Sequence, residues 1–412
     1  MTETQPPIYD VALIGGGIAG AAIARDAALR GMRVVLFEKN TFGSGTSSKT
    51  SKLIHGGIRY LETSWRALKR GDFAEAGKNF RFVFVALHET HVLARIAPDL
   101  IRPLPLIIPI YKEGGRNVWA VRFGALLYGL LALLTGSRHG PQILWTAKAV
   151  RARVPGLNPE GLAGGVLIWD HITDDVRLTQ TVLRDARQRG AQAYEQTEVK
   201  TYRYEAEAQR YAIDVQQKNL TCTFYARVLI NAGGPWVDEI RRRGGEPSEN
   251  LIVPVAGSHI EVPAFMPASV ILQAEDNRIF FVIRRGDRAR VGTTERIQKN
   301  PDDLVTPAED VTYLLRSLNR YFPDLKMTEK AILDRDTGIR PLARPRHALA
   351  PTDISREHEV YVGPAGVRHI LGVKLTDHRR AAAQIVDAIV PLVRPWNPGI
   401  QSHSQTGHVP LT

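Results

Sequence analysis

The chain has 412 residues, and its 44% hydrophobic and 23% charged residues are typical of a globular protein; this length predicts two closely packed domains. Lysine and arginine number 54 against 42 acidic residues, a net charge of +12, which favours anionic small molecules, anionic lipid surfaces or nucleic acid. Nucleic acid is the least favoured, because the sequence has neither zinc-finger spacing nor an aromatic-rich basic repeat.

Cys222 is the only cysteine, which excludes an internal disulfide framework and makes a reducing compartment the default. The N-terminal residues, Met-Thr-Glu-Thr-Gln-Pro-Pro, lack the basic region and apolar core of a signal peptide. We therefore expect a cytoplasmic protein, or one attached peripherally to the cytosolic face of a membrane. No metal site is predicted.

Residues 10–38 predict a strand, a glycine turn, a helix and a second strand. Gly15, Gly17 and Gly20 have the Gly-x-Gly-x-x-Gly spacing of a dinucleotide-binding unit. The first glycine permits a tight turn, the second lets the backbone approach a pyrophosphate, and the third lets the helix pack on the strand. Glu38 ends the second strand, where an acid accepts hydrogen bonds from ribose hydroxyls. This unit predicts dinucleotide binding.

A hydroxyl-rich loop follows at residues 40–61. It supplies backbone N–H groups, hydroxyls and a lysine for contacts with phosphate and a ring system; a flexible surface linker is the alternative. Within it, Ser47-Ser-Lys-Thr-Ser-Lys-Leu-Ile-His-Gly-Gly-Ile-Arg-Tyr-Leu61 resembles the hallmark of the FAD-dependent glycerol-3-phosphate dehydrogenases, which belong to the D-amino-acid-oxidase-like superfamily.

Two helices are predicted next. Residues 74–96 have the apolar spacing of an amphipathic helix. Residues 123–134 are almost wholly apolar, and about a dozen helical residues reach about 18 Å, too short for a bilayer core of about 30 Å. A buried core helix and a helix lying in a membrane interface are the two alternatives. Basic residues make 116–138 a candidate membrane-facing segment: Arg116, Arg122 and Arg138.

A helix is predicted over residues 174–190, with Asp174 as its N-cap, and hairpins are predicted between residues 194 and 224. The strand that follows ends in Asn231-Ala-Gly-Gly-Pro-Trp236, which resembles the second FAD motif of the same family, with Gly233 as a variant. The presence of both motifs separates FAD binding from NAD binding.

Residues 253–294 predict strands of a second sheet. Gly257-Ser-His259 and Gly292-Thr-Thr-Glu295 resemble substrate-domain motifs of the family, which usually has Asp where Glu295 stands. A helix is predicted over residues 308–321.

Thr337-Gly-Ile-Arg-Pro-Leu342 resembles the family's glycine-arginine-proline motif, and Leu371-Gly-Val-Lys-Leu-Thr376 resembles the start of its Gly-Gly-Lys-Leu-Thr-Thr-Tyr-Arg motif. The second motif departs from the family at Val373, Asp377 and His378, and Arg379 restores the match. A helix is predicted after this motif, with its N-terminus directed toward the flavin, where its dipole would stabilise negative charge.

The resemblance covers about residues 8–392 and implies an α/β fold, in which a Rossmann-type FAD-binding domain is interleaved with an antiparallel-sheet α+β substrate domain. Many family members carry a further helical C-terminal domain beyond this region. The expected FAD-binding segments are 8–80, 150–250 and 330–392, and the expected substrate segments are 81–149 and 251–329. Residues 393–412 are expected to be a disordered tail.

The resemblance implies FAD as cofactor and glycerol 3-phosphate as substrate. It also implies roles around the substrate for Arg59, Tyr60, His259, Arg340 and Lys374. Arg340 suits a phosphate because a guanidinium pairs with it in a bidentate manner, and His259 is the candidate base because histidine titrates near neutral pH. The implied FAD contacts are Gly15, Gly17, Gly20, Glu38, Lys39, Thr46, Ser47, Ser48, Ser51, Lys52, His55, Gly56, Gly57, Val199, Ala232, Gly233, Trp236, Gly338, Lys374, Leu375 and Thr376.

The implied reaction is oxidation of sn-glycerol 3-phosphate to glycerone phosphate by hydride transfer to flavin N5, with electrons passed to a quinone. One alternative is a related flavin oxidase or dehydrogenase that acts on an amine or a 2-hydroxy acid. Another is a flavin-binding, membrane-associated module that has lost catalysis.

Overall fold

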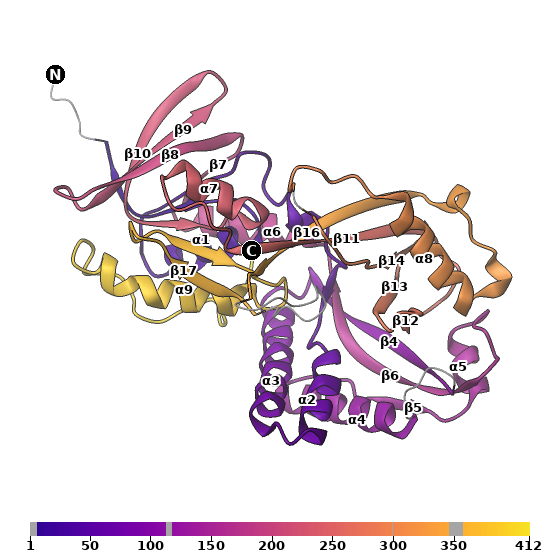
Figure 1. Ribbon diagram of the computed structural model, residues 1–412. Helices are drawn as coiled ribbons and strands as arrows, with labels where there is room; N and C mark the ends of the chain where they lie inside the picture. Colours follow the sequence, from indigo (N-terminus) through magenta and orange to yellow (C-terminus); the bar gives the residue numbers. More distant parts are fainter. Residues whose placement is uncertain (1–5, 113–117, 299, 346–356) are drawn as a thin grey trace.

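The computed structural model describes residues 6–112, 118–298, 300–345 and 357–412, and it arranges them around two β-sheets (Figure 1). The order of strands in the first sheet is β17-β18-β10-β1-β2-β7, and β9 and β8 extend it from β10. Its strands are β1 (Ile8–Ile14), β2 (Val34–Phe37), β7 (Gln192–Tyr194), β8 (Thr197–Glu205), β9 (Arg210–Gln217), β10 (Leu220–Asn231), β17 (Glu359–Val362) and β18 (Arg368–Leu371).

The centre of the first sheet is parallel, because β1 pairs in parallel with β10 on one side and with β2 on the other. Strand β1 is therefore buried, and Val11, Ala12 and Leu13 have no exposed surface. Helices α1 (Ile18–Leu29), α6 (Asp175–Gln188) and α9 (His378–Val393) pack together over one face. The carboxyl ends of β1 and β10 lie side by side, and this is the edge at which such folds bind nucleotides.

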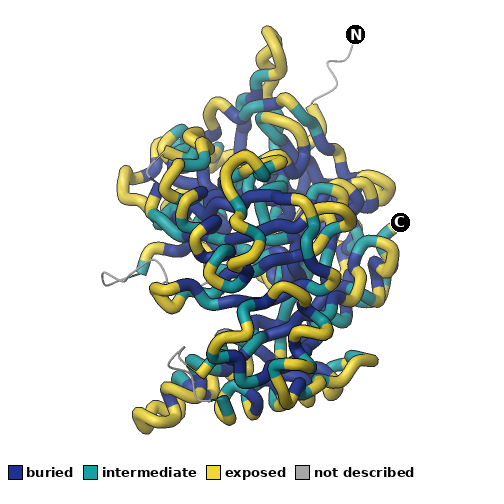
Figure 2. The backbone as a smooth tube through the Cα atoms, turned by 90° about the vertical axis from the view of Figure 1, so that its right-hand side faces the viewer, coloured by how far each residue is buried: buried dark blue, intermediate teal, exposed yellow. Residues whose placement is uncertain are grey.

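The second sheet is mostly antiparallel and has the order β15-β11-β14-β13-β12-β4-β6-β3, with β16 paired to β11 and β5 to β6. Its strands are β3 (Leu53–Ile54), β4 (Ile101–Tyr111), β5 (Gln142–Leu144), β6 (Leu162–Thr173), β11 (Ile252–Pro263), β12 (Ser269–Gln273), β13 (Ile279–Arg285), β14 (Arg288–Gly292), β15 (Arg296–Ile297) and β16 (Asp334–Ala343). Figure 2 shows the buried backbone concentrated in the middle of the molecule.

Helices cover both faces of the second sheet. Helices α3 (Phe73–Ile96) and α4 (Val118–Thr135) share one apolar core with β4 and β6. Helices α5 (Ala147–Arg153) and α8 (Ala308–Tyr321) share another core with β12 and β13. Two more helices are α2 (Arg59–Lys69), packed on α3, and α7 (Val237–Arg243), packed on β8. The predicted α/β fold with a second, antiparallel sheet is confirmed.

Three strands join the second sheet although the expected division of the chain assigned them to the FAD-binding segments. Strand β3 pairs with β6, β6 pairs with β4, and β16 pairs with β11 over ten residue pairs from Ile252 to Glu261. The second sheet therefore includes residues 53–54, 162–173 and 334–343. Local sequence pattern does not identify the partner of a strand, and this is why the division differs here.

Helix α4 is longer than the predicted twelve-residue segment. It contains 18 residues, about 27 Å at 1.5 Å per residue. Among the described residues it is the one helix whose length and composition would allow it to cross a membrane, and a third of it is buried against the protein. Residues 116 and 117, at the start of the candidate membrane-facing segment, lie outside the described residues.

The expectation of a disordered tail over residues 393–412 is not met. Residues 401–412 run along α1 and bond to it, with the amide of Gln401 donating to the carbonyl of Arg30 at 2.9 Å. Buried Arg30 donates to the carbonyl of Ser402 at 2.7 Å, and buried Arg25 donates to the carbonyl of Val409 at 2.8 Å. Polar composition suggested disorder, but these carbonyl groups satisfy buried guanidinium groups.

Candidate active site

The turn between β1 and α1 approaches the end of β10 closely. Gly15 has a φ of +106°, and a Cβ atom there would lie 2.5 Å from the carbonyl oxygen of Ala232. A Cβ atom on Gly20 would lie 1.9 Å from the carbonyl oxygen of Gly15, so the third glycine lets the helix pack on the strand.

Gly17 caps α1 without a side chain of its own, and the Ser47 hydroxyl accepts a hydrogen bond from the first helical amide, that of Ile18, at 2.9 Å. Gly17, Ile18 and Ala19 line a cavity at this helix end, where the backbone favours an anion.

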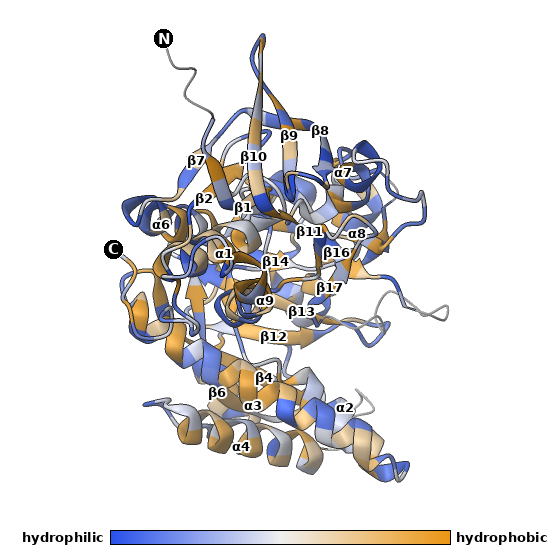
Figure 3. Ribbon diagram, turned by 90° about the vertical axis from the view of Figure 1, so that its left-hand side faces the viewer, coloured by the Kyte–Doolittle hydropathy of each residue, from blue (hydrophilic) through white to orange (hydrophobic). Residues whose placement is uncertain are grey.

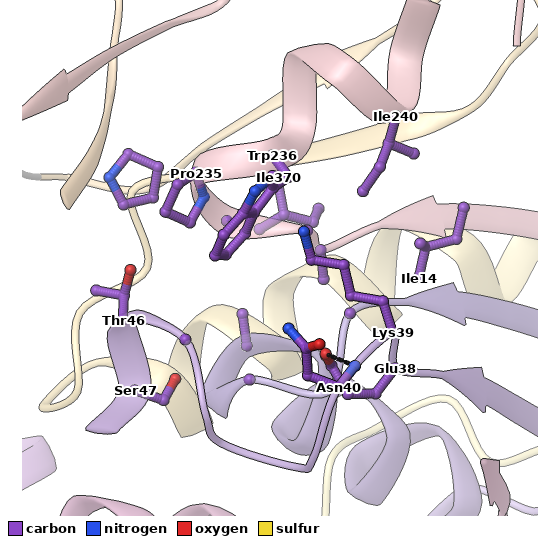
Figure 4. Close-up of a pocket in the computed structure, with 18 of the residues that line it drawn as sticks. Ile14, Glu38, Lys39, Asn40, Thr46, Ser47, Pro235, Trp236, Ile240 and Ile370 are labelled. Carbon is purple, nitrogen blue, oxygen red and sulfur yellow. Dashed lines mark hydrogen bonds between the residues drawn. The ribbon is translucent and has the colours of Figure 1, made fainter. Parts of the chain in front are cut away.

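Glu38 lines a cavity at this edge of the sheet (Figure 4). Its carboxylate accepts hydrogen bonds from the amides of Gly16, at 2.7 Å, and Asn40, at 2.8 Å. Opposite it, the Lys39 ammonium lies 4.0 Å from the ring centre of Trp236. Many of the predicted cofactor residues line this cavity: Gly15, Gly17, Glu38, Lys39, Thr46, Ser47, Val199, Ala232, Gly233, Trp236 and Leu375.

Other lining residues were not found from the sequence. They come from β8, α7, β18 and the loop after η1 (Thr46–Ser48), where no motif signals a cofactor contact. These residues are brought together by the packing of separate elements, which becomes visible once the strand order is known. They include Thr50, Thr197, Glu239, Ile240, Arg243 and Ile370.

Some predicted cofactor residues have structural contacts instead. The Lys52 ammonium forms a buried ion pair with Asp175 at the start of α6 and donates to the carbonyl of Ser48 at 2.9 Å. The Ser48 hydroxyl donates to the carbonyl of Gly45 at 2.9 Å. Gly338 lies against Lys49, where a Cβ atom would come within 2.6 Å of the lysine Cβ. These contacts hold the loop in place.

The His55–Gly56 turn connects the cofactor region to the helices of the second sheet. The amide of His55 donates to the Thr376 hydroxyl at 3.1 Å. The amide of Gly56 donates to the Tyr128 hydroxyl at 2.9 Å, and that hydroxyl donates to Asp170. Gly57, the next residue, has a φ of +74° and leads into α2. The turn is therefore fixed by α4 on one side and by the segment before α9 on the other.

The residues at this edge fit an FAD molecule. The start of α1, where Gly17, Ile18 and Ala19 line the cavity, and the close approach of Gly15 to Ala232 form a cradle for a pyrophosphate. Glu38 lies where the ribose hydroxyls would bind, and the cavity continues past Thr50 to Val373 and Leu375. An extended dinucleotide would therefore place its flavin end beside β16 and the start of α9.

Arg340 lies on β16 beside the cofactor cavity. Its guanidinium donates to the Thr293 hydroxyl at 3.1 Å, lies 3.9 Å from a Glu295 carboxylate oxygen, and is 24% exposed. It lies over Gly257, where a Cβ atom would come within 2.7 Å of the guanidinium. The guanidinium is therefore held in place, on a side chain that is partly exposed.

His259 lies on β11, opposite Asp336 of β16 in the strand register. Its side chain is 3% exposed. Burial lowers the pKa of its imidazole to about 4, although nearby Asp336 raises it. This histidine is therefore neutral at physiological pH and can accept a proton.

Lys374 and Tyr60 are brought together at the opposite side of the loop. The ammonium of Lys374 lies 3.4 Å from the Tyr60 hydroxyl and 3.9 Å from the ring centre of Phe82 on α3. Arg59 is the first residue of α2, and its side chain lies outside the described part of the structure. The predicted substrate residues thus form two groups, one on β11 and β16 and one between α2 and Lys374.

The loop of residues 46–57 contacts both groups. The Thr46 hydroxyl donates to the carbonyl of Ile339, next to Arg340, and the turn at His55 binds Thr376, two residues after Lys374. The loop therefore connects the two groups of polar side chains.

The family model described as FAD dependent oxidoreductase matches residues 10–373 of the chain. The protein belongs to this family of FAD-dependent oxidoreductases. FAD is accordingly its cofactor, as the cavity geometry indicates.

Two similar proteins have names that specify a substrate. The chain is 33% identical over 388 residues to an aerobic glycerol-3-phosphate dehydrogenase of Staphylococcus aureus strain MRSA252, an alignment that covers 92% of this chain and 67% of that protein. It superposes with a TM-score of 0.75 and 27% identity on the glycerol-3-phosphate dehydrogenase of Bacillus halodurans complexed with FAD, covering 100% of this chain and 68% of that one.

A glycine oxidase from Geobacillus kaustophilus is a more distant neighbour. It has 22% identity and a TM-score of 0.63, with 98% of both chains covered. This likeness shows a shared fold.

Proposed function

We propose that this protein oxidises sn-glycerol 3-phosphate to glycerone phosphate with FAD as the hydride acceptor. The observation that carries the proposal is Arg340, a guanidinium held by Thr293 and left partly exposed beside the cofactor cavity. A secondary alcohol that carries a phosphate needs such a group, because a planar guanidinium binds phosphate oxygens in pairs. The names of the relatives at 33% and 27% identity support the same substrate.

The chain's own residues supply binding and proton transfer. In this proposal Arg340 binds the phosphate and fixes the pose of the alcohol. His259 is the base that finally holds the extra proton, since its imidazole is neutral at physiological pH. Lys374 and Tyr60 line the opposite side, where a positive charge favours electron-rich groups. FAD, when bound, supplies the hydride acceptor.

Steady-state turnover with an artificial electron acceptor tests this function. We expect sn-glycerol 3-phosphate to be oxidised, and glycerol, which lacks the phosphate, to react poorly at the same concentration. Faster turnover of glycine, sarcosine or 2-hydroxyglutarate would contradict the proposal and favour an amine or 2-hydroxy-acid oxidase. Flavin bound without turnover of any substrate would favour a binding module.

We further propose that the protein binds the cytosolic face of a membrane and passes electrons to a quinone there. The outer side of α4 is apolar, and Figure 3 shows apolar residues along this helix at the lower edge of the molecule. Aromatic residues of α2 and α3 extend the exposed apolar area, with basic residues beside them. The exposed residues of this surface are Trp65, Leu68, Phe73, Phe80, Phe84, Trp119, Phe123, Leu126, Leu130, Leu133 and Leu134.

This arrangement suits a helix lying in the membrane interface. The inner side of α4, which includes Ala125 and Tyr128, packs against the protein, so the helix has no second face for lipid. At the end of α2, Lys69 adds positive charge that attracts anionic lipid, whereas Arg66 and Arg70 pair with Glu62 and Glu75. A location on the cytosolic side of a membrane follows from this proposal.

A further inference from the structure

The imidazole of His259 does not open onto the cavity directly. The residue is 2% exposed, and its Nε2 atom lies 3.0 Å from the Ser51 hydroxyl oxygen. Ser51 itself is partly exposed and follows Thr50, which lines the cofactor cavity. The Ser51 hydroxyl is therefore the partner of Nε2, and it belongs to a partly exposed residue whose chain neighbour lines the cavity.

The other side of the imidazole faces a fixed carboxylate. Nδ1 of His259 lies 3.6 Å from an oxygen of Asp336. The two carboxylate oxygens of Asp336 accept hydrogen bonds from both terminal nitrogens of Arg290, at 2.7 and 2.8 Å. A carboxylate opposite Nδ1 favours the tautomer that carries its proton on Nδ1 and leaves Nε2 as the acceptor.

The three strands that carry these groups hold the imidazole in one place. His259 is opposite Gly292 of β14 in the register, and a Cβ atom on Gly292 would lie 2.3 Å from the histidine ring. Arg290 also donates from Nε to the carbonyl of Thr50 at 3.1 Å. The same arginine thus fixes both Asp336 and the loop that carries Ser51.

We propose that Ser51, His259 and Asp336 form a proton relay in which Ser51, and not His259, contacts the hydroxyl of the substrate. The proposal rests on the proposed function, because it assigns the path of the proton in that reaction. Ser51 is then a catalytic residue, and Asp336 and Arg290 are positioning residues that act through His259.

The O–H bond of the substrate hydroxyl breaks, and its proton passes to the oxygen of Ser51. The original proton of Ser51 passes to Nε2 of His259, which becomes an imidazolium opposite the Asp336 carboxylate. The hydride leaves the carbon that bears this hydroxyl and is accepted by FAD, so the alcohol becomes a ketone. Deprotonation of the imidazolium to solvent resets the relay.

Ser51→Ala tests the relay directly in the FAD-loaded protein. The measurement is the limiting rate of anaerobic flavin reduction by sn-glycerol 3-phosphate in stopped flow. We expect a fall of about 10²-fold or more, the usual contribution of general acid–base catalysis, with recovery in Ser51→Thr, which keeps the hydroxyl. The dissociation constant of the substrate should change little, because the phosphate is bound elsewhere.

A double variant distinguishes a relay from two independent groups. If the proton passes through both residues, Ser51→Ala combined with His259→Gln reduces flavin no more slowly than His259→Gln alone. Multiplied losses would overturn the relay, as would a wild-type rate in Ser51→Ala. Failure of Ser51→Ala to retain FAD would overturn it too, because the hydroxyl would then serve the cofactor.

Asp336→Asn tests the positioning role. It should lower the limiting rate of flavin reduction while leaving the substrate dissociation constant near that of wild type, and Asp336→Glu should restore part of the rate. Asp334→Asn, two residues earlier on β16 and exposed, is the matched control and should behave as wild type. An Asp336→Asn rate equal to wild type would overturn this role.

These outcomes are separate from the test of the proposed function. If wild-type protein is not reduced by sn-glycerol 3-phosphate, the proposed substrate is wrong. The ratio of variant to wild-type rates is then measured with whichever alcohol or amine does reduce the flavin, and it reports on the relay alone.

Discussion

The proposed phosphate site depends on the shape of one side chain. Replacing Arg340 by Lys keeps the positive charge but loses the bidentate fork, so we expect the KM for glycerol 3-phosphate to rise about tenfold. Arg340→Ala should raise it further, to about a hundredfold, since each charge-assisted hydrogen bond contributes about 1.5–3 kcal/mol. Arg335→Ala, an exposed position on the same strand, serves as the control. Equal KM values for all four proteins would contradict the role of Arg340.

Asp170 should make stability depend on pH. Burial raises the pKa of this carboxyl group to about 7, although hydrogen bonds from Tyr128 and Gly56 oppose the shift. The folded state therefore holds a proton that the unfolded state releases near pH 4, and unfolding free energy falls as pH rises from about 4 to about 7.

Asp170 should change the free energy of unfolding over this pH range by a few kcal/mol, on the order of 1.4 kcal/mol for each unit of pKa shift. Asp170→Asn, which cannot ionise, should lose less stability than wild type between pH 5 and pH 8 in chemical unfolding. Asp214→Asn, on β9, is the control variant, and its stability should depend on pH as that of wild type does. Parallel pH dependence in wild type and Asp170→Asn would show that this carboxyl group does not titrate in that range.

At the residue scale, a motif places a side chain or glycine at the cavity where it ties that residue to a local turn. Gly15, Gly17 and Glu38 lie at the cavity as the spacing indicates, because the glycine turn and the strand after it are one local unit. Ser51 was assigned to the cofactor from its motif, and its contact with His259 joins residues 208 positions apart. Spacing cannot reveal such a pair, because strand register creates it.

At the scale of elements, the C-terminal segment is part of the folded core. Removing residues 401–412 takes carbonyl acceptors away from buried Arg25 and Arg30. A buried charge that loses a partner costs about 1–3 kcal/mol or more, so the truncated protein should unfold several degrees lower. Thermal unfolding of the FAD-loaded protein measures this, with Lys218→Ala on the exposed hairpin as control. An unchanged melting temperature would contradict this role.

The exposed side of α4 should determine membrane binding. Leu130→Glu combined with Leu134→Glu places charge on side chains that are 52% and 69% exposed, so folding should be preserved while sedimentation with anionic vesicles is lost. Leu220→Glu, at a 70% exposed position of β10, adds the same kind of charge elsewhere and should still sediment. Equal sedimentation of all three proteins would argue against an interface at α4.

Elements were predicted from local pattern, and their partners were not. The helix at residues 74–96 and the helix at 308–321 match α3 and α8, since apolar spacing is a local signal. The length of α4 was underestimated because Arg122 interrupts the apolar run five residues into the helix. The tail was mistaken for disorder because its stabilising partners are arginines on α1, far away in the sequence.

At the scale of the whole molecule, the chain passes several times between a nucleotide-binding sheet and a second sheet, and the first crossing, from β2 to β3, enters the loop of residues 46–57. Residues 46–57 contact the cofactor cavity, β16, α4 and the start of α9, so cofactor and substrate groups meet along it. The interleaved two-sheet fold was predictable because several family motifs occur in order along the chain. Which strands complete each sheet required the structure.

Anaerobic reduction of the bound flavin by sn-glycerol 3-phosphate is the most direct test of the proposed function. Purified protein should lose its flavin absorbance near 450 nm within the mixing time or shortly after, on the order of the turnover rates usual for enzymes, and Arg340→Ala should respond only at much higher substrate concentration. Flavin that stays oxidised in wild-type protein at saturating glycerol 3-phosphate would contradict the function proposed here.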